Sequence, residues 1–307
     1  MIIAAGLTPA WQQIVLLDRL QHGEVNRARA VHWCASGKVL NVGIALHHLG
    51  AVAETISLVG GLPVRSIDAE FEQFGIARKW VPTAAATRVC TTVLEAETGI
   101  ATELVENAAA VTEAELAEFQ SVFRESATAA DVILLAGSLP AGTPATYYRD
   151  LMTGLDARVI IDGRGAELVA ALEAAPYLVK PNREELARTV GRELTSDDDL
   201  VAAMRELNAA GAQWVLVTQG AQAVWLTSAT ECLRFQPPTI TPVNPIGSGD
   251  SLAAGIGWGL ANGDDITRAV QLGIAAGVEN ALQLLPGRVA AEAVIERAKA
   301  IDVESYR

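Results

Sequence analysis

The segment NPIGSGDS (residues 244–251) carries residues that are suited to phosphoryl transfer. Its glycines precede an apolar stretch, so consecutive backbone N–H groups can point at one spot at the start of a helix, where the helix dipole also favours negative charge. Gly247, Ser248 and Gly249 would form an anion hole there. Asp250, in the first helical turn, could accept a proton from a hydroxyl that attacks a phosphoryl group held in that hole. An aspartate that only stabilises the helix N-terminus is the alternative.

A second candidate group is the run KPNREEL (residues 180–186). Asn182 and Glu185 are three residues apart, and at the carboxyl edge of a sheet they could order the water shell that Mg²⁺ keeps in proteins. The same two residues are also a good N-cap and first turn of a helix, so a purely structural role stays open. Lys180 is notable because the chain has only four lysines.

Polar residues elsewhere could hold a phosphorylated or hydroxylated ligand. Lys38 and Asn41 follow Gly37 and lie one helical turn apart on one face of a predicted helix, where they could hold a phosphate and a hydroxyl. A solvated helix start is the alternative for this pair. Arg88 lies in a predicted strand and adds a further positive charge. The sequence contains neither the glycine-rich loop of P-loop proteins nor the catalytic loop of protein kinases.

A parallel sheet is needed to bring these groups together. From about residue 130, short apolar strands alternate with helical patterns, at residues 131–136, 158–162, 177–180 and 214–218. Thr112 and Thr195 are each followed three residues later by an acidic residue, as in a capping box at a helix start. The repeated units predict an α/β fold, a doubly wound and mostly parallel sheet with helices on both faces. Ligands bind such sheets at the carboxyl ends of the strands.

The first third of the chain follows a different pattern. Residues 10–34 and 78–105 alternate or lack a helical period, which predicts a small β-sheet that projects from the core as a lid. We therefore expect residues 1–307 to form a single domain with a discontinuous lid. An edge strand of the lid could pair with a second subunit, so a homodimer through the lid is one expectation.

Composition limits the class of protein and its partners. Half of the 307 residues are hydrophobic and 19% are charged, which excludes a disordered chain. The net charge of -13 argues against a nucleic-acid partner. No apolar run reaches the ~18 residues that a membrane span needs, and the first residues lack the basic start of a signal peptide. We expect a cytoplasmic protein with a small-molecule partner and no membrane partner.

Ten segments, taken in order, resemble the PfkB (ribokinase-like) carbohydrate kinases, and they cover nearly the whole chain. Within the family the pattern is most like the branch that contains 1-phosphofructokinase and tagatose-6-phosphate kinase. The segments are GLTPA (6–10), GEVNR (23–27), SGKVLNVG (36–43), LGA (49–51), TRVCT (87–91), TEL (102–104), GSLPAG (137–142), KPNREEL (180–186), VTQGAQAV (217–224) and NPIGSGDSLAAG (244–255). The resemblance implies a ribokinase-like fold and ATP-dependent phosphorylation of a sugar hydroxyl with Mg²⁺.

The resemblance also implies roles by position. Asp250 would be the catalytic base beside the anion hole of residues 247–249. The nucleotide would contact Lys180, Asn182, Thr218 and Gly220, with Mg²⁺ bound through water to Asn182 and Glu185. The acceptor sugar or sugar phosphate would contact Gln12, Arg27, Gly37, Lys38, Asn41 and Arg88. A monovalent cation beside the anion hole stays open.

Departures from the family pattern lie mainly on the acceptor side. Gln12 stands where the family has an aspartate, and Val39 stands where it has a glycine, which would narrow the pocket or forbid a backbone angle. Pro245 replaces a threonine near the anion hole. We expect a kinase of a ketose phosphate, of the 1-phosphofructokinase type. A kinase for a non-phosphorylated sugar or nucleoside and a non-catalytic sensor of sugar phosphates or nucleotides are the alternatives.

Overall fold

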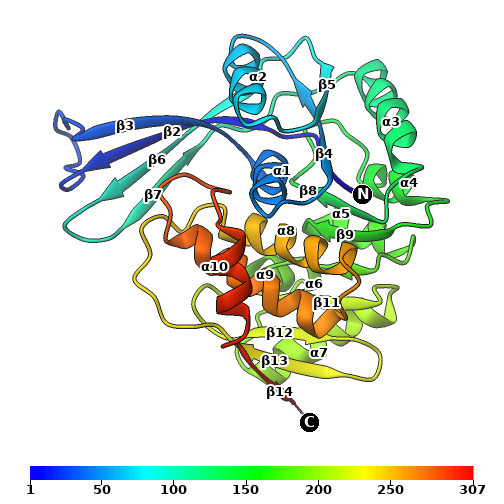
Figure 1. The fold of residues 1–307 in the computed structure, drawn as a ribbon. Coiled ribbons are helices and arrows are strands. Elements are labelled where there is room, and N and C mark those ends of the chain that lie inside the picture. The colour runs from blue at the N-terminus through cyan, green and yellow to red at the C-terminus, as the bar shows by residue number, and fades with distance from the viewer. Residues whose placement is uncertain (307) are drawn as a thin grey trace.

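A ten-stranded sheet forms the centre of the molecule, in the order β14-β13-β12-β11-β10-β9-β8-β1-β4-β5 (Figure 1). The computed structural model describes residues 1–306. The strands of this large sheet are β1 (Ile2–Gly6), β4 (Ala53–Val59), β5 (Arg78–Pro82), β8 (Val132–Ala136), β9 (Arg158–Asp162), β10 (Leu178–Val179), β11 (Trp214–Val217), β12 (Val224–Thr227), β13 (Cys232–Gln236) and β14 (Asp302–Ser305).

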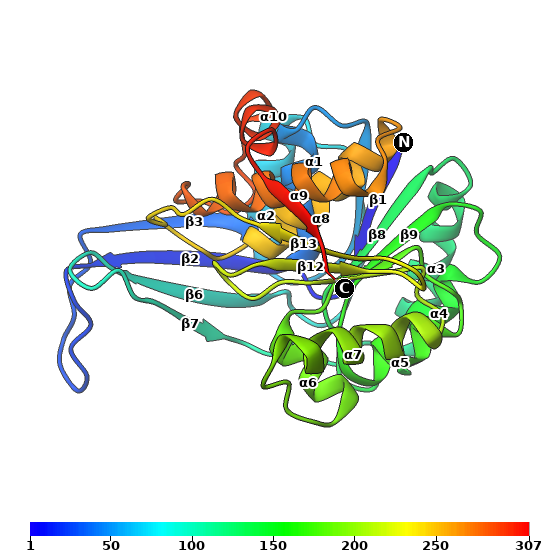
Figure 2. The ribbon, with the colours of Figure 1, turned by 90° about the horizontal axis from the view of Figure 1, so that it is seen from below.

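Helices cover both faces of the large sheet (Figures 1 and 2). Successive residues of β1 point to opposite sides: Ile2 and Ala4 join one hydrophobic cluster, and Ile3 and Ala5 join another. The helices of the first cluster are α1 (Lys38–His48), α8 (Ser248–Ala261), α9 (Ile266–Ala281) and α10 (Ala291–Ala298). Those of the second are α3 (Glu113–Ala127), α4 (Tyr147–Met152), α5 (Gly165–Leu172), α6 (Arg183–Val190) and α7 (Asp197–Ala209).

The strand order confirms the predicted doubly wound topology. Strands β5, β4, β1, β8, β9, β10 and β11 are parallel to one another, and β12, β13 and β14 extend the sheet beyond β11 through antiparallel pairs. The chain adds β4 and β5 on one side of β1 and β8 to β11 on the other. This reversal beside β1 creates the crevice in which ligands of such sheets bind.

A second, four-stranded sheet, the small sheet, extends away from the large one (Figure 2). Its strands, in spatial order, are β3 (Ala30–Ser36), β2 (Ala10–Leu17), β6 (Arg88–Glu95) and β7 (Ala101–Val105). The remaining helix, α2 (Pro63–Phe74), packs Ile67 and Phe71 against Ala35 at the base of β3.

Two expected boundaries are wrong. Residues 78–82 form β5, which pairs in parallel with β4 and belongs to the large sheet, so the second lid segment begins later than residue 78. β5 is a short edge strand with mostly half-buried residues, so its sequence does not distinguish it from a lid strand, which explains the error. The capping box predicted at Thr195 is at Ser196, because the Asp199 carboxylate, and not Asp198, accepts from the Ser196 amide. The capping box at Thr112 is confirmed.

Candidate active site

A cavity of about 670 Å³ lies where the small sheet meets the carboxyl ends of the large sheet. The cavity brings together every predicted site residue except one. These are Gln12, Gly37, Lys38, Asn41, Arg88, Lys180, Asn182, Glu185, Thr218, Gly220, Gly247, Ser248, Gly249 and Asp250. They come from β2, α1, β6, the ends of β10 and β11, α6 and the start of α8, so the fold alone makes them neighbours.

Arg27 is the exception. It is exposed in the connection between β2 and β3 and does not line the cavity. The pairing of Leu16 with Ala30 ends the β2–β3 ladder, so residues 18–29 extend beyond the far end of the small sheet. The structure therefore does not place Arg27 in the acceptor cluster of its own chain.

The segment 247–250 forms the start of α8 as predicted. Gly247 is the N-cap residue with a φ of 82°, and a Cβ there would lie 2.7 Å from Pro286 Cβ, so the turn requires glycine. The amides that follow belong to the first turn of the helix, where N–H groups lack helical partners and attract an anion. Asp250 is only 7% exposed, and its Oδ2 accepts a 2.7 Å hydrogen bond from Asn41 Nδ2.

Burial raises the pKa of Asp250 to about 6, and the nearby charge of Asp162 acts in the same direction. Lys38, Lys180 and the hydrogen bond from Asn41 partly offset these effects. A carboxylate with a pKa near neutrality is ionised in neutral solution and still basic enough to take a proton from a hydroxyl. The environment of Asp250 therefore suits a general base better than a helix-stabilising charge.

Asp162 is a site residue that we did not predict from the sequence. It ends β9, is 2% exposed and pairs with two lysines: Lys38 Nζ lies 2.6 Å from its Oδ1, and Lys180 Nζ lies 3.0 Å from its Oδ2. Burial would raise the pKa of Asp162, but the two lysines outweigh burial and lower it. A carboxylate at the carboxyl end of an apolar strand, followed by a glycine, is a signal that could have identified it.

Asn182 and Glu185 form the capping box of α6. Asn182 Oδ1 accepts from the Glu185 amide at 2.8 Å, and Glu185 Oε2 accepts from the Asn182 amide at 2.9 Å. Glu185 Oε1 lies 3.8 Å from Lys38 Nζ at the edge of the cavity. The capping role is thus real, and it also fixes Glu185 so that its second oxygen is available to a ligand.

Glu185 is the carboxylate of the cavity that a hydrated magnesium ion could reach, because both oxygens of Asp162 already face lysine ammonium groups. Among residues 1–306, three or more His, Cys, Asp or Glu side chains nowhere gather into a metal-binding group. Mg²⁺ commonly keeps several water ligands and binds one or two carboxylates together with substrate phosphates. Glu185 Oε1, with Asn182 three residues before it in the same capping box, fits that kind of site through bound water.

The departures on the acceptor side have defined structural consequences. Gln12 Nε2 donates a 2.7 Å hydrogen bond to Thr92 Oγ1, and both residues are buried. Val39 is helical and joins Leu40 and Ile44 in the core, so the expectation that it narrows the pocket is wrong.

No donor within residues 1–306 reaches the buried Asn41 Oδ1. That oxygen can accept a hydrogen bond from a ligand hydroxyl.

Arg88 lines the cavity at the base of β6. Its guanidinium donates to the carbonyl oxygens of Thr8 at 3.2 Å, Pro9 at 3.3 Å and Glu106 at 3.2 Å. The carboxylate of Glu103, on the neighbouring strand β7, lines the same cavity. Arg88 therefore keeps its positive charge at the cavity wall while it also ties the small sheet to the end of β1.

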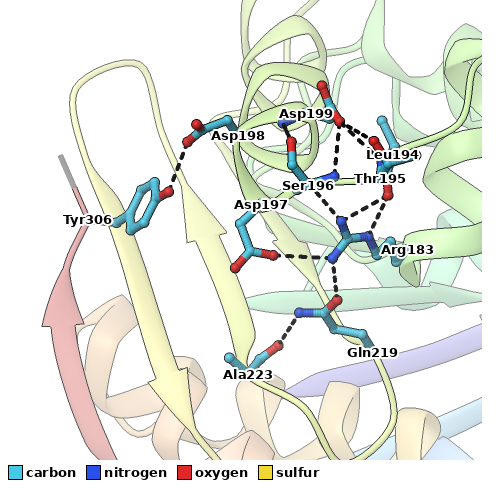
Figure 3. Close-up of polar contacts among 10 residues, drawn as sticks. All are labelled: Arg183, Leu194, Thr195, Ser196, Asp197, Asp198, Asp199, Gln219, Ala223 and Tyr306. Carbon is cyan, nitrogen blue, oxygen red and sulfur yellow. Dashed lines mark hydrogen bonds and ion pairs between the residues drawn. The ribbon is translucent and has the colours of Figure 1, made fainter.

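Thr218 and Gly220 form the loop after β11, and Thr218 pairs with Asn182 in an isolated β-bridge. Arg183, next to Asn182, binds this loop through Gln219 Oε1 at 2.8 Å (Figure 3). The same guanidinium donates to the carbonyl oxygens of Leu194 and Ser196 and to the carboxylate of Asp197. Arg183, for which the sequence predicts no role, thus fixes a groove of about 790 Å³ that shares Asn182, Thr218 and Gly220 with the cavity.

The family is settled by a model of the pfkB family carbohydrate kinases, which matches residues 10–287. The chain belongs to this family. It is therefore a phosphotransferase with an alcohol group as acceptor, on a ribokinase-like fold. Among residues 1–306, no helix is both long enough and apolar enough to cross a membrane.

Solved structures of known proteins share the fold. Phosphofructokinase-2 from Escherichia coli is 26% identical, and its complex with fructose-6-phosphate has a TM-score of 0.87 over 98% of this chain and 99% of that one. Its complex with potassium has a TM-score of 0.88 over the same shares, and its tetrameric inhibited form has 0.88 over 97% and 98%. A possible 1-phosphofructokinase from Thermotoga maritima, 19% identical, has a TM-score of 0.89 over both complete chains.

Proposed function

We propose that this kinase transfers the γ-phosphoryl group of ATP to a hydroxyl group of a ketose phosphate, as a 1-phosphofructokinase does. The observation that carries the proposal is Asp250, a buried carboxylate with a raised pKa that faces the cavity directly beside the helix start of α8. Catalytic carboxylates are commonly found in such surroundings.

The chemical step follows from this arrangement. Asp250 Oδ2 is held by Asn41, which leaves Oδ1 to receive the proton of the attacking hydroxyl. The hydroxyl oxygen forms a bond to the γ-phosphorus while the bond from that phosphorus to the bridging oxygen breaks, and ADP leaves with the electron pair. The amides of Gly247 and Gly249 and the ammonium group of Lys180 stabilise the negative charge of the transferring group, and the Ser248 amide, which donates to Pro245 O at 3.2 Å, would have to turn toward it to contribute.

Glu185 and Asn182 would hold the water shell of a magnesium ion, which would supply positive charge to neutralise the nucleotide phosphates. Thr218 and Gly220 would contact the nucleotide, because their loop lies between the cavity and the groove that continues from it. Asn182 supports this loop through its bridge to Thr218. The small sheet would act as the lid that covers the acceptor.

Positive charges on the acceptor side of the cavity favour a phosphorylated sugar. Arg88 and Lys38 place two cations on the cavity wall, and Gly37 brings the start of α1 close to the same region. No side chain caps the start of α1 and its first turn has no acidic residue, so an anion near Gly37 would meet uncapped backbone N–H groups and no repelling charge. The relative from Escherichia coli binds fructose-6-phosphate on the same fold.

A neutral sugar or nucleoside is the second candidate, and it rests on a specific observation. Lys38 is already paired with Asp162, and the N–H groups of Arg88 already donate to three carbonyl oxygens. Glu103 adds a negative charge to the same wall. An acceptor without a phosphate would leave these pairs intact.

Turnover of Mg-ATP by the purified protein tests both candidates. The panel contains fructose 1-phosphate, fructose 6-phosphate, tagatose 6-phosphate, fructose, ribose and adenosine. We expect ADP formation with a ketose phosphate and little with the neutral compounds. ADP formation only with a neutral compound would replace the first candidate by the second. ATP binding without turnover on any acceptor would contradict both and favour a sensor.

A further inference from the structure

Asn280, near the end of α9, is the most connected side chain beside the anion hole. It is 1% exposed, and its Nδ2 donates to Ile246 O at 2.9 Å and to Ser248 Oγ at 3.1 Å. Its Oδ1 accepts from Ser251 Oγ at 3.0 Å and from the Gly287 amide at 2.7 Å. One amide group thus joins both sides of the Gly247 turn to the segment that follows α9.

A cation at this place would need several oxygen atoms whose lone pairs converge on it. The oxygens around the turn instead accept hydrogen bonds from groups of the protein. Asn244 Oδ1 accepts from the Ile246 amide at 3.1 Å, and Gly247 O accepts from the Ser251 amide at 2.9 Å. Leu284 O accepts from Asn244 Nδ2 at 2.8 Å. The residues present therefore do not fit a monovalent cation at this turn.

We propose that Asn280 takes the place of a monovalent cation in this kinase. Its NH₂ group supplies the two positively polarised hydrogens that hold Ile246 O and Ser248 Oγ together, so the anion hole keeps its shape without K⁺ or Na⁺. This inference rests on the proposed kinase reaction. By this proposal the chain needs no monovalent cation at the anion hole, whereas phosphofructokinase-2 from Escherichia coli has been crystallised in complex with potassium.

The same amide also reaches the residue that holds the base. Gly287, bonded to Asn280 Oδ1, has a φ of 75°, and a Cβ there would lie 3.0 Å from Asn41 O. Asn41 in turn donates to Asp250. Asn280 is therefore a positioning residue for the anion hole on one side and for the environment of Asp250 on the other.

The first test is a comparison of the wild-type protein in tetramethylammonium, Na⁺ and K⁺ salts at constant ionic strength. We expect kcat to change by less than about twofold, which is far below the effect of losing an anion-hole donor (~10²-fold). We also expect the same melting temperature in all three salts. A K⁺-dependent rise in kcat of about tenfold or more, or a melting temperature raised only by K⁺, would overturn the proposal.

Two variants test the residue itself. Asn280→Ala should lower kcat by roughly 10- to 100-fold with little change in the acceptor KM. Asn280→Asp replaces the NH₂ group, and with it both donors, by one carboxylate oxygen, so K⁺ should raise both the kcat and the melting temperature of the variant above the values in tetramethylammonium. Asn262→Ala, at an exposed asparagine after α8, is the matched control and should retain wild-type kcat. Wild-type kcat in Asn280→Ala would contradict the proposal.

The melting temperatures keep this inference separate from the proposed function. If no acceptor supports turnover, the proposed function fails, and the wild-type melting temperatures in K⁺ and tetramethylammonium still decide whether a cation binds. If turnover is found and K⁺ stimulates it, only the role of Asn280 is wrong.

Discussion

Asp250 and Asp162 are two buried carboxylates in one cavity, and their surroundings drive their pKa values in opposite directions. Two lysines lower the pKa of Asp162, whereas burial and the charge of Asp162 itself raise the pKa of Asp250. Such divergence between neighbouring acids is how active sites divide roles between charge balance and proton transfer. Asp162 holds the lysines in place, and Asp250 exchanges the proton.

The pH dependence of kcat/KM should report the ionisation of Asp250. The base must be deprotonated to accept the hydroxyl proton, and its pKa in the free enzyme is about 6. We expect kcat/KM to be level above that pH and to fall about tenfold for each further pH unit below it. A profile that stays level down to pH 4 would exclude Asp250 as the base.

Substitution of Arg88 tests whether the acceptor carries a negative charge. Its removal should raise the KM for a phosphorylated acceptor by roughly 10- to 100-fold, since a charged hydrogen bond contributes about 1.5 to 3 kcal/mol, with a smaller effect on kcat. Steady-state kinetics of Arg88→Gln would measure this change. Arg65→Gln, at an exposed arginine of α2, is the control and should leave KM unchanged. An unchanged KM in Arg88→Gln would favour the neutral acceptor.

Sequence patterns could predict the residues whose role depends on local structure. The glycines and Asp250 follow from the geometry of one helix start, and Asn182 follows from a capping pattern. Asp162 and Asn280 could not be predicted in this way, because their partners come from distant segments: Lys38 lies 124 residues from Asp162, and Ile246 lies 34 residues from Asn280. Only the fold brings these groups together.

Strongly apolar strands can be predicted from the sequence, whereas half-buried edge strands cannot. β8 and β9 are apolar and largely buried, and they lie where the sequence predicts them. The sequence places β5 in the wrong sheet because its mostly half-buried residues do not reveal which strand it pairs with. The run of aspartates 197–199 likewise led to the wrong capping register for α7, since Asp198 stands three residues after Thr195 just as Asp199 stands three residues after Ser196.

The close contact between α8 and α9 depends on glycine. A Cβ on Gly255 would lie 2.8 Å from Gly273 Cα and 2.9 Å from Leu272 O, both of them backbone atoms that cannot move aside. We expect Gly255→Ala to lower the free energy of unfolding by ~1–3 kcal/mol, although alanine usually favours a helix. Urea denaturation would measure this loss.

Gly257→Ala is the matched control for this substitution. Its Cβ would meet mainly the side chain of Leu134, which can adjust, so the loss should be smaller than in Gly255→Ala. A Gly255→Ala protein that is as stable as the wild type would contradict this prediction, because it would show that α8 and α9 can move apart without a loss in the free energy of unfolding.

The face of the small sheet that points away from the cavity is an exposed apolar surface. Along β2, Gln12 lines the cavity, whereas Trp11 and Gln13 point to the other side. Trp33 pairs with Gln13 across the ladder, stacks on Trp11 and is 46% exposed. The surface also includes Val31, Val89 and Leu104, all of them exposed. We propose that a second copy of the chain covers this surface, as the expected homodimer through the lid requires.

Sedimentation of Trp33→Asp tests that interface. A charge in an apolar contact is expected to destabilise it, so the variant should sediment as a monomer at concentrations where the wild type is a dimer. Val169→Asp, at an exposed valine of α5 on a different part of the molecule, should leave the dimer intact. A wild-type protein that sediments as a monomer would contradict the proposal.

The turnover of Asp250→Asn at saturating ATP and acceptor tests whether Asp250 is the base of the reaction. Asparagine keeps the size of the side chain and can still accept from Asn41, but it cannot take the proton. Loss of a general base should lower kcat by ~10²–10⁴-fold while ATP and acceptor still bind.

The ionised Asp250 costs the folded state stability above pH 6, because its pKa rises from 3.8 to about 6 on folding. The variant should therefore be at least as stable as the wild type at pH 7.5, which separates loss of chemistry from loss of fold. A kcat within a few-fold of the wild-type value would contradict the role of Asp250 as the base.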